Sequence, residues 1–428
     1  MLDQLLVNQV RRRVEASGLP FVVELWNGEQ FGSVIDAAVR VRLHQAASLK
    51  AMADPSLGTL ARAYVEGAID LDGDVRDILA LGDRLCNAGD CTPKTGSDSW
   101  KWWRHTRSKD RRNIQYHYDV SNDFYGLWLD KRRVYSCAYF KHPDMSLDAA
   151  QVAKLDHICR KLDLQPDEQL LDIGCGWGGL ILHAAERYGV RAVGITLSDD
   201  QHAYVSEQIE ARGLAGRVEV RRMDYRDVPE HGGYDKIASV GMFEHVGRLN
   251  LATYFDKINA LLRPGGLVLN HGITTSDPDS SGLGSGIAEF IEDYVFPGGE
   301  LVHASEVLRA AAGSGLECLD AENLRPHYGK TLWHWVTRLE QNADEARQLI
   351  GEQKYRIWRI YMAGSAYAFD HGWMELWQVL AGKAVDGKQL NYPFKRDFIY
   401  SGEKPLPPVT RAATRFSRVD KTQSVRSQ

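Results

Sequence analysis

Long apolar runs, clustered cysteines and an excess of charge of one sign are all missing from this sequence. No apolar stretch approaches the ~18 residues that a membrane-spanning helix needs. Residues 1–18 carry their Arg cluster after only a few apolar positions, which predicts an amphipathic helix and not a secretory signal. The cysteines form no CxxC pair and no tight cluster with histidine, so we expect no disulfide framework, no metal site and a reduced, cytoplasmic chain.

The composition is that of a soluble globular chain with room for two or three domains. It has 428 residues, of which 44% are hydrophobic and 25% charged. Shifts in composition predict an N-terminal α+β domain over 1–91, a basic Trp-rich linker over 92–115, a larger domain over 116–392 and a basic, partly disordered tail over 393–428. Residues 100–112 could bind nucleic acid on charge alone, but because the chain as a whole is acidic, with a formal net charge of −5, we expect no nucleic-acid partner.

The N-terminal region mixes strand and helix patterns. Residues 20–31 read as a β-hairpin with Asn27–Gly28 at its turn. Residues 57–85 read as a helix, a Gly-containing turn and a second helix. Within them Asp70, Asp72 and Asp74 alternate like metal ligands, but the rest of a calcium loop is missing, and we expect a solvated turn.

Two basic segments lie before and at the end of the larger domain. Residues 100–112 hold three tryptophans and six Lys or Arg against one Asp, and residues 395–428 hold eight Lys or Arg against three acids. Trp rings and long cationic side chains suit a lipid headgroup interface. A linker whose tryptophans pack on the domain would show the same pattern, so residues 100–112 are either a membrane contact or a linker.

From about residue 151 the pattern alternates between short buried strands and helices. One helix has apolar residues at positions 152, 155, 158, 159 and 162. Such alternation predicts an α/β domain with a doubly wound, parallel sheet. The predicted strands are 169–173, 191–196, 217–222, 235–240 and 266–271.

A glycine-rich loop follows the first of these strands. Gly174, Gly176 and Gly179 have GxGxxG spacing between a strand and a helix, where the backbone can approach a ligand closely. Asp172 stands where dinucleotide folds have an apolar residue, and the second strand ends at Thr196 without the acid that would bind a ribose. S-adenosylmethionine, which has an ammonium group and no phosphate, fits these features better than a nicotinamide dinucleotide.

Several motifs resemble the cyclopropane-fatty-acyl-phospholipid synthase family of S-adenosylmethionine-dependent enzymes. They are YHYDVSNDFYGLWLD (116–130), VYSCAYF (134–140), LLDIGCGWGGL (170–180), MDYRDV (223–228), SVGMFEHVG (239–247), EDYVFPGGEL (292–301) and ELWQVL (375–380). The resemblance implies a class I methyltransferase fold with a seven-stranded, mostly parallel sheet over 116–392. It also implies a homodimer that associates peripherally with the inner face of a phospholipid membrane.

The chemistry implied by this resemblance adds the methyl carbon of S-adenosylmethionine across the cis double bond of a phospholipid acyl chain. Such a reaction has to exclude water, and aromatic faces can stabilise the resulting carbocation. In the family, a bound bicarbonate removes a proton and the cyclopropane ring closes. The residues that match its ligands are Cys137, Glu244, His271 and the backbone of Ile273. On sequence alone Cys137 could be a core residue and His271 a core or capping residue.

One position departs from the family pattern. In KTLWHWV (330–336) the chain has Val336 where the family supplies a tyrosine to the anion site, and only Tyr328, His334 and Trp335 could replace it. This departure keeps a second reading open, a fatty-acyl C-methyltransferase that leaves a methyl or methylene branch without ring closure. A methyltransferase for a soluble substrate and a lipid-binding module with a vestigial site are further alternatives.

The resemblance also assigns residues to the cofactor. An aromatic run at Tyr116, Tyr118, Phe124, Tyr125 and Trp128 lines either the acyl channel or the core. The assigned cofactor residues are Tyr135, Ser136, Asp172, Gly174, Gly176, Gly179, Thr196, Leu197, Gln201, Tyr225 and Arg226.

Overall fold

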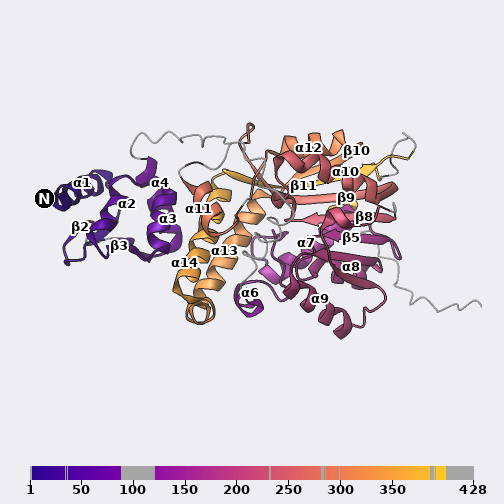
Figure 1. The fold of residues 1–428 in the computed structure, drawn as a ribbon, viewed down its shortest axis with the longest axis horizontal. Coiled ribbons are helices and arrows are strands. Elements are labelled where there is room, and N and C mark those ends of the chain that lie inside the picture. Colours follow the sequence, from indigo (N-terminus) through magenta and orange to yellow (C-terminus); the bar gives the residue numbers. More distant parts are fainter. Residues whose placement is uncertain are drawn as a thin grey trace, which may run out of the picture.

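The computed structural model describes residues 2–87 and 121–401, apart from 34, 36, 231–232, 281–283, 285, 298, 386–389 and 391. Residues 100–112, Tyr116, Tyr118 and the tail after residue 401 therefore lie outside the described residues. Figure 1 shows a small N-terminal domain at one end of the long axis and a large sheet with its helices at the other. Helices α11, α13 and α14 stand between them.

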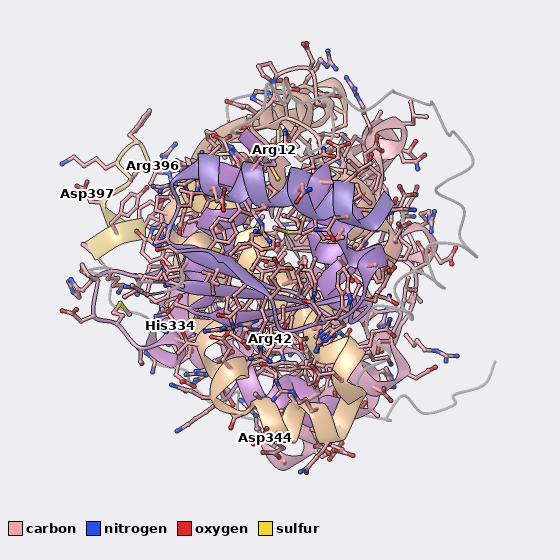
Figure 2. All side chains as sticks on the ribbon, turned by 90° about the vertical axis from the view of Figure 1, so that its left-hand side faces the viewer. Arg12, Arg42, His334, Asp344, Arg396 and Asp397 are labelled. Carbon is pink, nitrogen blue, oxygen red and sulfur yellow. The ribbon has the colours of Figure 1, made fainter. Side chains whose placement is uncertain are left out.

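The N-terminal domain is built on a four-stranded sheet of order β2-β1-β3-β4. The predicted hairpin is present: β1 and β2 pair antiparallel, and Gly28 adopts φ +87° in the turn between them. Figure 2 looks along the long axis from this end, with helix α1 and the small sheet in front of the larger domain. The elements are β1 (Phe21–Glu24), β2 (Gln30–Gly32), β3 (Val39–Leu43), β4 (Ile69–Gly73), α1 (Leu2–Ser17), α2 (Leu49–Ala53), α3 (Leu57–Val65) and α4 (Val75–Asn87).

The prediction for residues 57–85 was wrong in its middle part. Between α3 and α4 the chain forms strand β4 and not a solvated turn. Asp70 and Asp72 alternate because they lie on this strand, where Asp72 pairs with Arg42 on β3. Asp70 accepts from Arg356 Nη2 at 2.7 Å, and Asp74 accepts from the Arg76 backbone at 2.8 Å. Asp70 and Asp72 therefore form ion pairs with arginines, and Asp74 caps the start of α4.

The large domain has the predicted doubly wound sheet. Its seven strands run in the order β10-β11-β9-β8-β5-β6-β7, all parallel except β11, which is antiparallel to both neighbours. This is the seven-stranded, mostly parallel class I methyltransferase sheet. The strands are β5 (Gln169–Ile173), β6 (Arg191–Thr196), β7 (Val218–Arg222), β8 (Tyr234–Val240), β9 (Leu262–Thr275), β10 (Leu316–Asn323) and β11 (Met374–Lys383).

Helices cover the sheet because central strands such as β5 and β8 are buried along almost their whole length and have to be covered on both faces. Side-chain caps start several of them, for example Ser198, which accepts from the Gln201 backbone at 3.3 Å. The helices are α6 (Asn122–Trp128), α7 (Leu147–Lys161), α8 (Gly179–Tyr188), α9 (Asp199–Ala211), α10 (Leu251–Leu261), α11 (Ile287–Tyr294), α12 (Ala304–Gly313), α13 (Arg325–Gln341), α14 (Ala343–Asp370) and α15 (Asp397–Ser401).

The two domains are joined by polar contacts from α3, β4 and α4 to α11 and α14. Arg359 Nη1 donates to Tyr64 Oη at 3.1 Å, and Tyr367 Oη donates to Asp83 at 2.9 Å. Tyr294 Oη donates to Glu66 at 2.9 Å. Among the described residues, no helix is both long and apolar enough to cross a membrane.

Candidate active site

The glycine loop turns sharply between β5 and α8. Gly174, Gly176 and Gly178 have φ of +82°, +54° and +78°, where an L side chain would be strained. The backbone N–H groups of Gly174 and Cys175 donate to the Ile195 carbonyl at 3.0 and 2.9 Å, which ties the loop to β6. A Cβ on Gly174 would lie 2.9 Å from the side chain of Met242. The loop therefore packs closely against the segment that follows β8.

A cleft with an empty volume of ≈780 Å³ opens beside this loop. It lies at the carboxyl ends of β5, β6, β7 and β8, where doubly wound sheets place their ligands. Seven of the predicted cofactor residues line it: Gly174, Gly176, Thr196, Leu197, Gln201, Tyr225 and Arg226. Tyr135, Ser136, Asp172 and Gly179 are not among its lining residues.

Hydrogen bonds fix the side chains on one wall of the cleft. Thr196 Oγ1 donates to Gln201 Oε1 at 2.6 Å and accepts from the Ser198 backbone at 3.2 Å. Both Thr196 and Gln201 are buried. The amide of Gln201 is thereby held beside the cleft, where it can hydrogen-bond a ligand hydroxyl without a carboxylate at the end of β6.

The segment after β7 forms the opposite wall. Asp224 lines the cleft, and Arg226 donates to it through Nε at 2.8 Å and Nη2 at 2.6 Å. The Tyr225 ring stacks edge-on against Tyr254 at 5.5 Å. The positive charge of Arg226 is therefore balanced, and this wall presents an aromatic face and a carboxylate. Asp224 was not among the predicted site residues, although it belongs to a quoted motif.

Asp172 lies at the end of β5 with 2% of its surface exposed, and its Oδ1 has no hydrogen-bond partner among the described residues. Burial raises the pKa of Asp172 to about 7, against the attraction of Lys154, which lowers it. Gly179 begins α8, and a Cβ there would come within 2.9 Å of Val134. This third glycine of the motif permits close packing of α8 on the segment before Tyr135.

Lys154 on α7 is a buried charge that the sequence reading missed. Its Nζ donates to Ser136 Oγ at 3.0 Å, and burial lowers the pKa of Lys154 to about 8. The charge acts on Asp172, Cys137 and His271, which places these predicted residues around one buried amine. In the sequence, the only indication of this buried charge was a lysine on the buried side of a predicted helix.

Cys137 is fully buried next to Ser136. Its Sγ donates to the Ala138 carbonyl at 3.2 Å. Burial raises the pKa of the Cys137 thiol. The sulfur therefore stays protonated at neutral pH, and it can act as a neutral donor but not as a thiolate nucleophile.

Glu244 follows β8 and reaches across to β9. Its Oε1 accepts from the Ile273 backbone at 2.7 Å, whereas its Oε2 is buried without a hydrogen-bond partner among the described residues. Burial raises the pKa of Glu244 to about 7, although the Ile273 N–H lowers it. The carboxyl group is thus close to half-protonated at neutral pH and can both accept and donate a hydrogen bond.

His271 on β9 is 1% exposed. Gln378 Nε2 on the adjacent strand β11 lies 3.1 Å from its Nδ1, and with the amide in this orientation the ring proton is on Nε2. That Nε2 is also buried without a partner among the described residues. Burial, with the positive charge of Lys154, keeps the pKa of His271 well below its usual value, so the ring is neutral.

The prediction of a bicarbonate site can be compared with the hydrogen-bonding capacity that these residues have left. Glu244 Oε2 and His271 Nε2 are two buried polar atoms with capacity left for an anion that both donates and accepts, which fits. The Ile273 N–H is already taken by Glu244. Val336 is 1% exposed and supplies no hydroxyl. Of its neighbours, Trp335 is fully buried and its indole N–H has no partner among the described residues.

An aromatic cluster packs beneath the glycine loop. Phe124, Tyr125 and Trp128 on α6 are all fully buried, so they form core. Tyr125 contacts Trp177 of the loop at 4.7 Å between ring centroids, and Trp177 Nε1 donates to Asn122 at 2.8 Å. The other members of the cluster are Tyr135, Trp335 and Trp358. The cluster excludes water from the space around Tyr135 and supports the loop.

Comparisons with known proteins agree with this geometry. The family model described as mycolic acid cyclopropane synthetase matches residues 105–379, and a model described as a domain of unknown function matches residues 12–84. A probable fatty acid methyltransferase of Pseudomonas putida is 42% identical over 400 residues, covering 92% of this chain and 100% of the relative. Cyclopropane mycolic acid synthase 1 of Mycobacterium tuberculosis is 37% identical, covering 63% of this chain and 96% of the relative.

A solved structure shares the fold of the large domain. It is the mycolic acid cyclopropane synthase CmaA1 complexed with SAH and CTAB, with a TM-score of 0.61 and 36% identity, covering 64% of this chain and 98% of the other. The shared sheet, the glycine loop and the matched family model all indicate the same family. The chain belongs to the mycolic acid cyclopropane synthetase family and is an S-adenosylmethionine-dependent methyltransferase of the cyclopropane synthase type.

Proposed function

We propose that this protein transfers the methyl carbon of S-adenosylmethionine to the cis double bond of unsaturated phospholipid acyl chains and forms a cyclopropane ring. The observation that carries the proposal is that Glu244, just after β8, and His271 on β9, beside the last residue of β8, are buried with one open polar atom each, close to the cofactor cleft. Transfer to a heteroatom needs no second anion site, whereas ring closure needs a place for a proton acceptor.

The residues of the cleft position the cosubstrate. S-adenosylmethionine supplies an electrophilic methyl group. Gln201, held by Thr196, is placed to bind a hydroxyl of the ligand. Tyr225 offers an aromatic face, and Asp224 offers carboxylate acceptors. Positioning matters here because an isolated alkene is a weak nucleophile, and alignment at van der Waals distance supplies much of the rate.

Glu244 and His271 are the residues that would hold a bicarbonate. Neutral His271 donates from Nε2, and Glu244 accepts or donates through Oε2, so an anion with one O–H could be bound between them. Trp335 would add an N–H where the family has a tyrosine hydroxyl. The Tyr135 ring, which packs against Trp335 at 5.3 Å between ring centroids, would offer an aromatic face to positive charge that develops on the acyl chain.

The lipid substrate implies contact with a membrane surface. The basic Trp-rich segment 100–112 and the basic tail supply cations that anionic headgroups attract. We propose that they hold the enzyme transiently on the cytoplasmic leaflet as a homodimer, so that two surfaces bind together. Mass photometry of the purified protein tests the dimer, and a monomer at all concentrations would contradict it.

Lipid analysis of an expressing host tests the reaction. Cells that express the wild-type chain should accumulate phospholipids with acyl chains one methylene unit heavier, and Glu244→Gln should abolish most of that accumulation. Fragmentation that locates a ring at the former double bond supports the proposal. A methyl or methylene branch would instead show that methyl transfer occurs without ring closure.

A further inference from the structure

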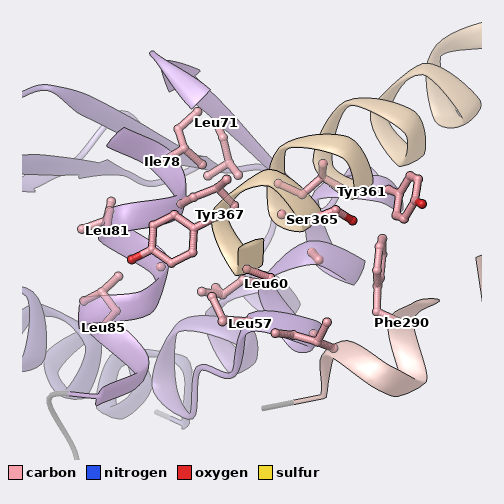
Figure 3. A pocket seen from close by; sticks show the side chains of 18 of the residues that line it. Leu57, Leu60, Leu71, Ile78, Leu81, Leu85, Phe290, Tyr361, Ser365 and Tyr367 are labelled. Atoms are coloured by element: carbon pink, nitrogen blue, oxygen red, sulfur yellow. The ribbon is translucent and has the colours of Figure 1, made fainter. Parts of the chain in front are cut away.

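A second cavity lies between the two domains. It has an empty volume of ≈1010 Å³ and is lined from one side by β3, β4 and α2–α4 and from the other by α11, α14 and the start of β11. Figure 3 shows Leu57, Leu60, Leu81 and Leu85 on one side and Tyr361 with Phe290 on the other. Its volume reaches the top of the ~300–1,000 Å³ range of small-molecule pockets.

The lining of this interdomain cavity is almost entirely apolar. Its polar side chains are Ser365, Tyr361, Tyr367 and Trp373, and the Tyr367 hydroxyl donates to Asp83 at 2.9 Å. A peptide would bring backbone N–H and C=O groups that such a wall cannot pair. A hydrocarbon chain has no such groups and gains from every methylene that it buries.

The docking of the domains builds the cavity. Gly58 on α3 touches the backbone at Gly286 so closely that a Cβ would lie 2.1 Å from the Gly286 carbonyl oxygen. Arg62 donates to Asp293 at 2.5 Å, and Arg356 donates to the Tyr64 carbonyl at 3.0 Å. These contacts surround the apolar lining with a polar rim, so the cavity is formed by the way in which the two domains pack together.

The cavity lies close to the cofactor cleft, with a short series of aromatic rings between them. Tyr361, which lines the cavity, contacts Phe296 at 5.7 Å between ring centroids. Phe296 contacts His245 at 5.7 Å, and His245 lines the cofactor cleft. On the strand side, Met374 lines the cavity, and two residues later Leu376 pairs with Ile273 beside Glu244. Between the lining residues Tyr361 and His245 there is thus one further ring, that of Phe296.

We propose that the interdomain cavity binds an alkyl chain of the substrate phospholipid. This inference rests on the proposed function and adds that the N-terminal domain forms half of the lipid site. A phospholipid has two chains, and a second apolar pocket beside the cleft would hold the chain that is not reacting. The N-terminal domain would then select a diacyl lipid over a single-chain one.

The substitution Gly364→Leu fills the cavity from helix α14. Gly364 lines the cavity, and a Cβ there meets nothing within 4 Å, so the new side chain has room. Leucine also favours a helix more than glycine does, so the variant should fold. The matched control is Gly313→Leu, because Gly313 is exposed at the end of α12 and a Cβ there also meets nothing within 4 Å.

Binding is measured with a phosphatidylglycerol whose saturated chains carry a photoreactive diazirine, presented in mixed vesicles. On irradiation the wild-type protein and Gly313→Leu should become cross-linked within residues 57–85 and 360–374, and peptide mass spectrometry locates the sites. Gly364→Leu should lose this labelling, and its KM for an unsaturated phospholipid should rise about tenfold, with S-adenosylmethionine binding unchanged.

Labelling confined to other parts of the wild-type chain, or unchanged in Gly364→Leu, would overturn the inference while leaving turnover of phospholipids intact. Failure of the proposed function would give a different result, because the wild-type protein would then form no modified phospholipid even if the cavity is labelled.

Discussion

The substitution Glu244→Gln should make the protein more stable and nearly inactive. Glutamine keeps an oxygen that accepts from the Ile273 N–H, which is 2.7 Å from Glu244 Oε1, so the fold loses no hydrogen bond. What it removes is a carboxyl group that is 9% exposed and whose pKa burial raises from 4.5 to about 7. The folded protein thus holds that proton more tightly than the unfolded chain does.

The sign follows from proton binding. Between pH 4.5 and pH 7 the folded state keeps the Glu244 proton and the unfolded state releases it, so the free energy of unfolding falls as the pH rises. At ~1.4 kcal/mol for each tenfold change in proton affinity, the loss amounts to about 3 kcal/mol at pH 8. Below pH 4.5 this penalty is absent.

Denaturant unfolding of the wild type and Glu244→Gln at pH 5 and pH 8 measures this effect. The stability gap in favour of the variant should widen by about 2.5 kcal/mol from pH 5 to pH 8, and turnover should fall by about 100-fold to 10,000-fold with S-adenosylmethionine affinity unchanged. Glu345→Gln, at an exposed position in the first turn of α14, is the control. An equal gap at both pH values, or turnover near that of wild type, would refute the reasoning.

Lys154→Met removes the charge that lowers the pKa of Asp172, so that Asp172 becomes more protonated at pH 7. The affinity for S-adenosylmethionine, measured by calorimetry, should therefore fall at least about tenfold at pH 7 and partly recover at pH 9; a loss of affinity that does not depend on pH would contradict this. Trp335→Phe deletes a buried N–H without a described partner, so turnover should drop about tenfold with unfolding free energy unchanged, and full activity would remove Trp335 from the anion site. Gly58→Ala should lower the free energy of unfolding by about 1–3 kcal/mol, because its Cβ meets the Gly286 backbone, and unchanged resistance to denaturant would speak against a tight domain contact. Neutralising Arg104, Arg107, Arg111 and Arg112 should weaken flotation with anionic vesicles at least about tenfold; unchanged flotation would identify 100–112 as a linker.

The fold of the large domain was predictable where strands are buried on both faces. Strands β5, β6, β8 and β9 lie inside the sheet and carry buried apolar runs, and the sequence locates all four. It also locates β7, although this edge strand is only partly buried. Strand β10 is half-exposed at a sheet edge, with acidic residues at several positions, so no periodicity identified it. Strand β4 was misread as a turn because its aspartates are paired by Arg42 and Arg356, which are distant in sequence.

The candidate site was predictable where residues follow strand ends. Glu244 and the glycine loop follow β8 and β5, as this rule predicts, at the carboxyl ends of the parallel strands. His271 was expected to end its strand, but β9 continues to Thr275, and His271 lies beside Val240, the last residue of β8. Lys154 and Gln378 were missed because only tertiary contacts show that a polar residue on a buried face points to the site. The interdomain cavity arises from docking two domains, which no local pattern can reveal.

The central claim is that a methyl carbon from S-adenosylmethionine ends in a cyclopropane ring on a phospholipid chain. The most direct measurement incubates the purified protein with methyl-labelled S-adenosylmethionine and vesicles of a cis-unsaturated phosphatidylglycerol, and locates the label by NMR of the extracted lipid. The account predicts the label in the ring methylene, at the position of the former double bond. Label in a branch methyl group, or none in the phospholipid, would contradict it.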